Sequence, residues 1–166
     1  LGRKMDQLII DVLDGGGNAA NIAHGSAGLT LAKALTVYET FGEADIPDDG
    51  QRYFVVSPAG WADLLQLDQF SRAEYVGEAD LPFAGGMTAK KWLGFTFFTH
   101  SGLTLSSADR DCHAYHSSAL GLATGSDVRT EINYVPEKVS NLITSYFSAG
   151  AVEIDESGMI QCIVRE

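Results

Sequence analysis

The residues of this sequence that could most readily do chemistry lie together in one short segment. Asp109-Arg110-Asp111-Cys112-His113-Ala114-Tyr115-His116 contains carboxylates, a thiol and two imidazoles, groups that bind transition metals or act as acids, bases and nucleophiles. In a strand, His113 and His116 point to opposite faces and cannot share one ion without a bulge, whereas on a helix they could. The remaining Cys and His residues are isolated in the sequence: His24, His100 and Cys162. We therefore expect ordinary hydrogen-bonded residues of a loop and strand here, and no metal.

Other motifs give equally little support to catalysis. Gly15-Gly16-Gly17-Asn18 follows a predicted helix, whereas a phosphate-binding loop follows a strand and ends in Gly-Lys-Ser or Gly-Lys-Thr. Gly25-Ser26-Ala27-Gly28 only loosely resembles the Gly-x-Ser-x-Gly turn of serine hydrolases. Cys112 beside His113 does not indicate a thiol protease, because catalytic pairs are brought together by the fold and not by adjacency. The sequence therefore predicts no catalytic residue and no cofactor.

The composition describes one folded, acidic domain. The 166 residues are 45% hydrophobic and 20% charged, close to globular averages. The net charge of −11 has the wrong sign for binding phosphates, so sequence-specific nucleic-acid binding is not expected. No apolar run reaches the roughly 20 residues of a membrane span, and no secretion signal is visible, so we expect a cytosolic product without a membrane partner.

Periodicity places helices early in the chain. The first predicted helix ends at Gly15-Gly16-Gly17 and has one apolar stripe: Met5, Leu8, Ile9, Val12 and Leu13. Residues 15–28 are interpreted as a loop. Thr30 caps a second helix whose expected apolar side is Leu31, Ala34, Leu35, Tyr38 and Phe41. Residues 52–56 are a predicted buried strand, and Ser57-Pro58 begins a helix directly after it.

Strands dominate the later part of the chain. Residues 77–91 are expected to be a long exposed loop, after which period-two alternation begins at Trp92. Strands follow at 111–116, 119–124 and 127–135, and the last is expected to have one solvated face. Residues 142–154 and 159–164 are predicted to pair as antiparallel neighbours. Helices first and strands last indicate the α+β class.

Several segments, taken in order, resemble the major capsid proteins of tailed bacteriophages and prophages, which have the Hong Kong ninety-seven type of capsid fold. Residues 2–11 are similar to the end of the family's long spine helix. The other segments similar in order and spacing are 29–47, 52–58 with Trp61, 92–95 and 140–154. The family's N-terminal arm, extended loop and first part of the spine helix have no counterpart before Leu1, so we expect the sequence to start inside a longer protein.

The resemblance implies an organisation and an interface. Residues 1–15 are then the end of the spine helix in the peripheral domain, 16–135 the axial domain around five-fold and six-fold vertices, and 136–166 the C-terminal strands of the peripheral domain. By analogy the loop 77–91 is an intersubunit surface. Its candidate residues are Leu81, Pro82, Phe83, Lys90 and Lys91.

The resemblance also implies a function. The chain would be a structural subunit of an icosahedral viral or prophage capsid that self-assembles around double-stranded DNA, in the host bacterial cytoplasm and then in the virion. Its partners would be copies of itself in pentamers and hexamers, together with scaffold, portal and decoration proteins. Two alternatives remain: the shell protein of an encapsulin-like nanocompartment, and a small metal-dependent hydrolase. A neighbouring cargo-enzyme gene would favour the first of these, and stoichiometric bound metal the second.

Overall fold

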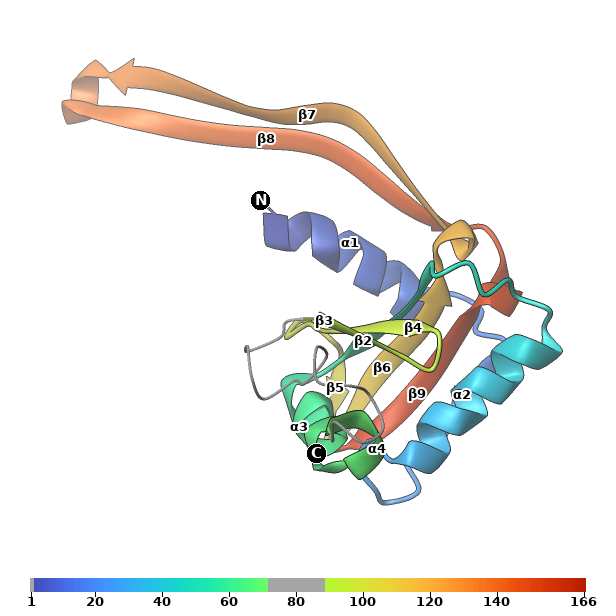
Figure 1. The fold of residues 1–166 in the computed structure, drawn as a ribbon. Helices are drawn as coiled ribbons and strands as arrows, with labels where there is room; N and C mark the ends of the chain where they lie inside the picture. Colours follow the sequence, from blue (N-terminus) through green and yellow to red (C-terminus); the bar gives the residue numbers. More distant parts are fainter. Residues whose placement is uncertain (1, 72–88) are drawn as a thin grey trace.

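The computed structural model describes residues 2–71 and 89–166, and the body of the molecule is one mixed β-sheet with helices on both sides (Figure 1). Within the described residues, seven strands run in the order β1-β9-β6-β2-β4-β3, with β5 paired to β6. They are β1 (Ala20–Ile22), β2 (Arg52–Val56), β3 (Ala89–Trp92), β4 (Phe95–Thr99), β5 (Leu105–Ser106), β6 (Asp109–His116) and β9 (Met159–Arg165). β2 and β4 pair in parallel, as do β1 and β9, while the remaining pairs are antiparallel. This mixture of helices and strands is the α+β class that the sequence predicted.

The helices cover the two faces of this sheet. α1 (Gly2–Gly15) lies on one face, and the other face carries α2 (Leu31–Glu43), α3 (Pro58–Gln66) and α4 (Asp68–Ser71) (Figure 1). None of the described helices is long and apolar enough to cross a membrane. The predicted starts of α2 and α3 are confirmed, because the Thr30 hydroxyl accepts a hydrogen bond from the Lys33 amide and Ser57 accepts one from Gly60.

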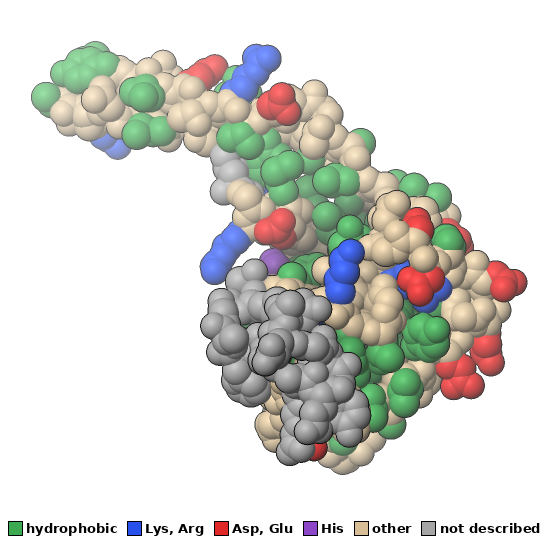
Figure 2. Space-filling view, in the orientation of Figure 1, with side chains coloured by type: hydrophobic (Ala, Val, Ile, Leu, Met, Phe, Trp, Pro, Cys, Tyr) green, Lys and Arg blue, Asp and Glu red, His purple; other side chains and the backbone are tan. Residues whose placement is uncertain are grey.

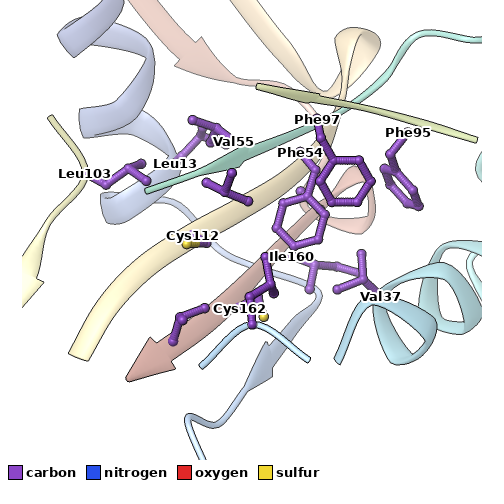
Figure 3. Close-up of a cluster of buried hydrophobic side chains, with 14 of the residues drawn as sticks. Leu13, Val37, Phe54, Val55, Phe95, Phe97, Leu103, Cys112, Ile160 and Cys162 are labelled. Carbon is purple, nitrogen blue, oxygen red and sulfur yellow. The ribbon is translucent and has the colours of Figure 1, made fainter. Parts of the chain in front are cut away.

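Aromatic side chains fill the core between the sheet and α2 to α4 (Figure 3). The rings of Phe54 and Phe97, on neighbouring strands, stack with centroids 4.9 Å apart. Phe41 of α2 meets Phe95 edge-to-face at 5.2 Å. The period-two alternation predicted from Trp92 onward is present in β4, where Phe95 and Phe97 point into the core.

The two long helices bury only some of the residues expected, among them Leu13 in α1 and Ala34 and Phe41 in α2. In α1 the buried residues are Ile10 and Leu13, while Ile9 is only partly buried. In α2 the expected residues Leu35 and Tyr38 are each 45% exposed, and the helix buries Lys33, Ala34, Val37 and Phe41. Leu35 and Tyr38 of α2 are exposed because the Lys33 side chain is on the buried side of the helix, where its ammonium donates to three backbone carbonyls. These acceptors are Ala27, Gly28 and Ile163, at 2.8, 2.9 and 3.1 Å.

Two predicted loops contain strands. Residues 20–22 form β1, at the edge of the sheet beside β9. Residues 89–91 of the expected loop 77–91 are also in a strand, because residues 89–92 pair with β4 as β3. Lys90 is buried there, since its ammonium donates to the Phe70 carbonyl and lies 4.4 Å from the centroid of the Phe70 ring. The prediction that Lys90 belongs to an exposed loop was wrong.

The C-terminal strands do not pair with each other as predicted. β8 (Ser140–Glu153) pairs with β7 (Leu120–Val135), a single bulged strand where the sequence predicted two. β9 instead lies between β1 and β6, because Met159, Ile160, Cys162 and Val164 are apolar and need the interior of the large sheet. The expected domain boundary between residues 135 and 136 therefore falls at the tip of the β7–β8 hairpin, and β9 belongs to the sheet that holds β2 and β6.

Candidate assembly surface

Strands β7 and β8 form a two-stranded antiparallel hairpin, named the arm, that projects from the body of the molecule (Figure 1). β8 has 14 residues, which corresponds to roughly 45 Å at about 3.3 Å per residue. Bulges near Ser126 interrupt the ladder, which continues to the pair Val135 and Ser140 at the tip. Pro136 begins the tip turn because its fixed φ and missing amide end the strand.

The two faces of the arm differ in chemistry. Directly paired residues share a face, and the register pairs Ile132 with Ile143. The apolar face, so named here for Ile132, Tyr134 and Ile143, also contains Asn141 opposite Tyr134, and a hydrogen bond at 2.9 Å joins the hydroxyls of Thr130 and Ser145. The opposite, polar face contains Arg129, Glu131, Asn133, Ser140, Thr144 and Tyr146, with Val135 and Leu142 as its apolar exceptions. On that face the Tyr146 hydroxyl donates to the Glu131 carboxylate at 3.0 Å.

The apolar face of the arm is open to solvent in the isolated chain. Ile132 is 66% exposed, Tyr134 60% and Ile143 65%. Figure 2 shows hydrophobic side chains along the arm and around its base, whereas most of the visible acidic side chains gather on the body. An isolated two-stranded hairpin is at best marginally stable in water, and a large exposed apolar patch marks an interaction site. The arm is therefore the surface of the described chain that most needs a partner.

The segment with the densest chemistry lies in β6 and makes structural contacts. His113 and His116 point to opposite faces, as expected for a strand. His113 bonds to Asp14 at 2.7 Å, and His116 bonds to Asp49 at 3.1 Å and to Ser118 at 2.7 Å. Within residues 2–71 and 89–166, no three His, Cys, Asp or Glu side chains are arranged to hold a metal ion. The geometry thus offers no metal centre in the described part of the chain.

The two cysteines are poor nucleophiles. Cys112 and Cys162 are paired across β6 and β9, and both are fully buried and form no disulfide. Burial raises the pKa of the Cys112 thiol to about 12 and that of Cys162 to about 11. Since the thiolate is the reactive form, neither sulfur is activated at neutral pH.

The interface residues expected by analogy are divided in the structure. Leu81, Pro82 and Phe83 lie outside the described residues. Lys91 is exposed on β3, while Lys90 is buried in the same strand and is unsuited to a surface contact. The structure therefore leaves Lys91 as the described candidate from that group.

The arm was not identified as a surface from the sequence, although its strands were. Alternation over residues 127–135 predicted one solvated face, but both faces of this part of the arm are exposed. The same alternation arises when the apolar face packs on the core of its own chain and when that face is exposed in the isolated chain and binds another molecule. Only the three-dimensional arrangement separates these two cases.

Comparison with known proteins gives a consistent result. A family model described as "Phage capsid protein" matches residues 1–166. No sequence among the curated proteins matches the chain. Among solved structures, one from Mycobacterium phage Che8 is similar with a TM-score of 0.72 and 21% identity, covering 96% of this chain and 57% of that one. The capsid structure of cyanophage P-SCSP1u has a TM-score of 0.72 and 14% identity, covering 98% and 62%.

A more distant structural likeness is to a different kind of shell. The encapsulin of the holo-SrpI complex from Synechococcus elongatus PCC 7942 has a TM-score of 0.53 and 10% identity, covering 88% of this chain and 53% of that one. The present chain spans about 57–62% of the length of the two phage chains. At these identities the structural likenesses show the fold, which is that of phage capsid subunits.

Proposed function

The chain belongs to the phage capsid protein family, and from this premise we propose that it is a structural subunit of an icosahedral viral shell that self-assembles around double-stranded DNA. Copies of the chain, gathered as pentamers and hexamers, are its main partners. The shell is the capsid of the virion, and assembly takes place in the host bacterial cytoplasm. Scaffold, portal and decoration proteins are its further partners.

The observation that carries the proposal is the arm. Its apolar face exposes Ile132, Tyr134 and Ile143 by 60% or more, far from the core that stabilises the body. A shell subunit makes the same contacts in every copy, so a surface left open in one chain is covered when the copies assemble. Many repeated contacts can each be weak and still close a stable shell by avidity.

The strand pairing supports an assignment of the two capsid domains. We assign the seven-stranded sheet with α2, α3 and α4 to the axial domain, and the arm with α1 to the peripheral domain. α1 contacts β8, and the Gly17 amide donates to the Glu153 carboxylate at 2.9 Å where helix and arm meet. Lys91, with Leu81, Pro82 and Phe83, is proposed as a second contact between copies.

The same chemistry supports a structural role without catalysis. The two histidines of β6 are occupied by hydrogen bonds to Asp14, Asp49 and Ser118, and both thiols are buried. We expect purified protein to contain no stoichiometric transition metal by elemental analysis. About one zinc per chain, lost in His113→Ala or His116→Ala, would support the hydrolase alternative instead.

The proposal is tested by the size of what the protein forms. The protein is expressed in bacteria, purified, and studied by sedimentation velocity and negative-stain electron microscopy. We expect closed icosahedral particles, or rings of five and six copies when assembly partners are absent. A monodisperse monomer under all assembly conditions would contradict the proposal.

The likeness to an encapsulin favours one second candidate, the shell of a nanocompartment. The two candidates differ in what the particle encloses. Particles from the native host that hold double-stranded DNA support the capsid, and particles that hold a cargo enzyme support the nanocompartment. Nuclease treatment and mass spectrometry of purified particles distinguish these outcomes.

A further inference from the structure

The deepest polar contact between α1 and the sheet joins Asp14 to His113. The His113 side chain is fully buried and that of Asp14 is 20% exposed. An ionised carboxylate can only accept, so His113 Nε2 carries the proton and donates to Asp14 Oδ1 at 2.7 Å. The other ring nitrogen, Nδ1, is buried and has no hydrogen-bond partner in the described part of the chain. Asp14 is thus the polar anchor of this imidazole.

Asp14 also reaches a second segment of the body. Its Oδ2 atom accepts a hydrogen bond from the Thr104 hydroxyl at 2.5 Å. Asp14 lies in the last turn of α1, so both bonds are made at the C-terminal end of the helix. Nearer the N-terminus, Gln7 donates to the Gly102 carbonyl at a longer 3.3 Å. The strong polar attachment of the helix is therefore at one end.

α1 buries Ile10 and Leu13 in the core, but openings border the helix beside these residues. An opening of about 330 Å³ lies between residues Asp6 to Leu13 of the helix and Phe98 and Tyr115 of the sheet. A second opening of about 230 Å³ continues from Ile9 and Tyr115 to the base of the arm. Both openings are connected to solvent, so the side chains that line them lack packed neighbours on one side, and packed contacts fix orientation. These openings leave the N-terminal part of the helix room to pivot about its anchored end.

The connection after α1 adds little stiffness of its own. Gly15-Gly16-Gly17 has the wide conformational freedom of glycine, and a Cβ atom at Gly16 would lie 2.5 Å from the Glu153 carboxylate. Larger residues would therefore collide with the base of the arm. Because α1 also contacts β8 and the Gly17 amide bonds to Glu153, a pivot of the helix carries the arm with it.

We propose that the Asp14–His113 pair is the pin that sets the angle of α1 and the arm relative to the sheet. Asp14 and His113 are positioning residues in this role. The consequence for assembly rests on the proposed function: in a shell subunit, the angle at which the arm projects determines the curvature of the shell. Loss of the pin should therefore broaden the range of arm angles, and with it the range of particle sizes.

The angle can be measured without assembly. Spin labels on Lys4→Cys in α1 and Ala59→Cys in α3 report the distance across the sheet by electron paramagnetic resonance. Both positions are exposed, while the native Cys112 and Cys162 are fully buried and will react slowly. The width of the distance distribution is the readout, because a pivot on any timescale is frozen into it.

The variants distinguish loss of the Asp14–His113 pair from a general loss of packing in the core. Asp14→Ala removes both bonds and should widen the distribution about twofold, as expected when a collective motion is released. Asp14→Asn retains an acceptor for His113 and should keep the wild-type width. Val164→Ala perturbs the buried core of β9 away from the pair and should also keep it. Widening by Val164→Ala equal to that by Asp14→Ala would overturn the proposal.

Thr104→Val keeps the test decisive if Asp14→Ala does not fold. Thr104 is exposed, so its replacement should be tolerated, and the loss of one bond to Asp14 should give intermediate widening. An unchanged distribution in Thr104→Val and in folded Asp14→Ala would refute the pin. Particle diameters by electron microscopy are the second readout. If the wild type forms no shells the proposed function fails, while the distance measurement still decides on the pin.

Discussion

Ile132 on the apolar face of the arm offers the sharpest test of where copies meet. Its side chain is 66% exposed in the isolated chain, and full burial of such a side chain is worth about 1.5–3 kcal/mol. Covering the remaining two-thirds at a contact would therefore gain about 1–2 kcal/mol per copy. Ile132→Thr removes most of this gain and keeps a residue that favours strands. The concentration needed for assembly should rise about 5- to 30-fold, since about 1.4 kcal/mol corresponds to a factor of ten.

The matched control lies one residue away on the opposite face. Asn133→Thr makes the same final side chain on the polar face and should leave the assembly concentration unchanged. Light scattering against protein concentration measures assembly, and thermal unfolding measures the stability of the subunit. Both variants should change the free energy of unfolding by less than about 0.5 kcal/mol, as for exposed positions. Normal assembly of Ile132→Thr, or equal impairment by Asn133→Thr, would refute the assignment of the apolar face.

Three further predictions concern the body of the molecule. Lys33→Met leaves three carbonyls without their ammonium donor and should lower the free energy of unfolding by about 3 kcal/mol or more. Urea denaturation measures this change, and a loss below about 1 kcal/mol would show that the ammonium is dispensable. Lys90→Glu buries a carboxylate against the Phe70 carbonyl and ring and should destabilise the protein by about 3 kcal/mol. Lys91→Glu, at an exposed position, should change the stability by less than about 0.5 kcal/mol. Equal changes in stability would contradict the burial of Lys90. Burial opposes ionisation of Asp14, but the hydrogen bonds from His113 and Thr104 outweigh this and lower the pKa of Asp14 below 3.8. The ionised carboxylate therefore stabilises the fold above that pH, and this contribution is lost as the pH falls through the lowered pKa. Asp14→Asn should remove this loss of stability in acid, and a pH profile of stability equal to that of the wild type would contradict the prediction.

Local chemistry made the ends of the helices predictable. Thr30, Ser57 and Pro58 cap or begin helices with their own side chains, so a short window of sequence contains the whole cause. The buried aromatic strands were equally visible, because Phe95 and Phe97 alternate with less buried neighbours. These features needed no knowledge of distant contacts.

The strand partners and the buried lysines could not be predicted in the same way. Lys90 is expected in an exposed loop from the sequence, and nothing in the sequence indicates that Lys33 is buried. In the structure both are buried, because carbonyls from other elements accept hydrogen bonds from each ammonium. β9 follows the arm in sequence and still returns to the large sheet, since pairing is decided by apolar burial across the whole molecule. The solvent exposure of both faces of the arm likewise depends on which elements lie next to them in three dimensions, and a short window of sequence does not contain this.

A cryo-electron microscopy reconstruction of the assembled particles shows whether copies of the chain meet through the arm. We predict an icosahedral shell in which the sheet gathers around the five-fold and six-fold axes and the arm contacts neighbouring copies, with Ile132 and Ile143 covered. A protein that remains a monomer would contradict the shell, and a shell in which both residues stay exposed to solvent would contradict the role of the arm.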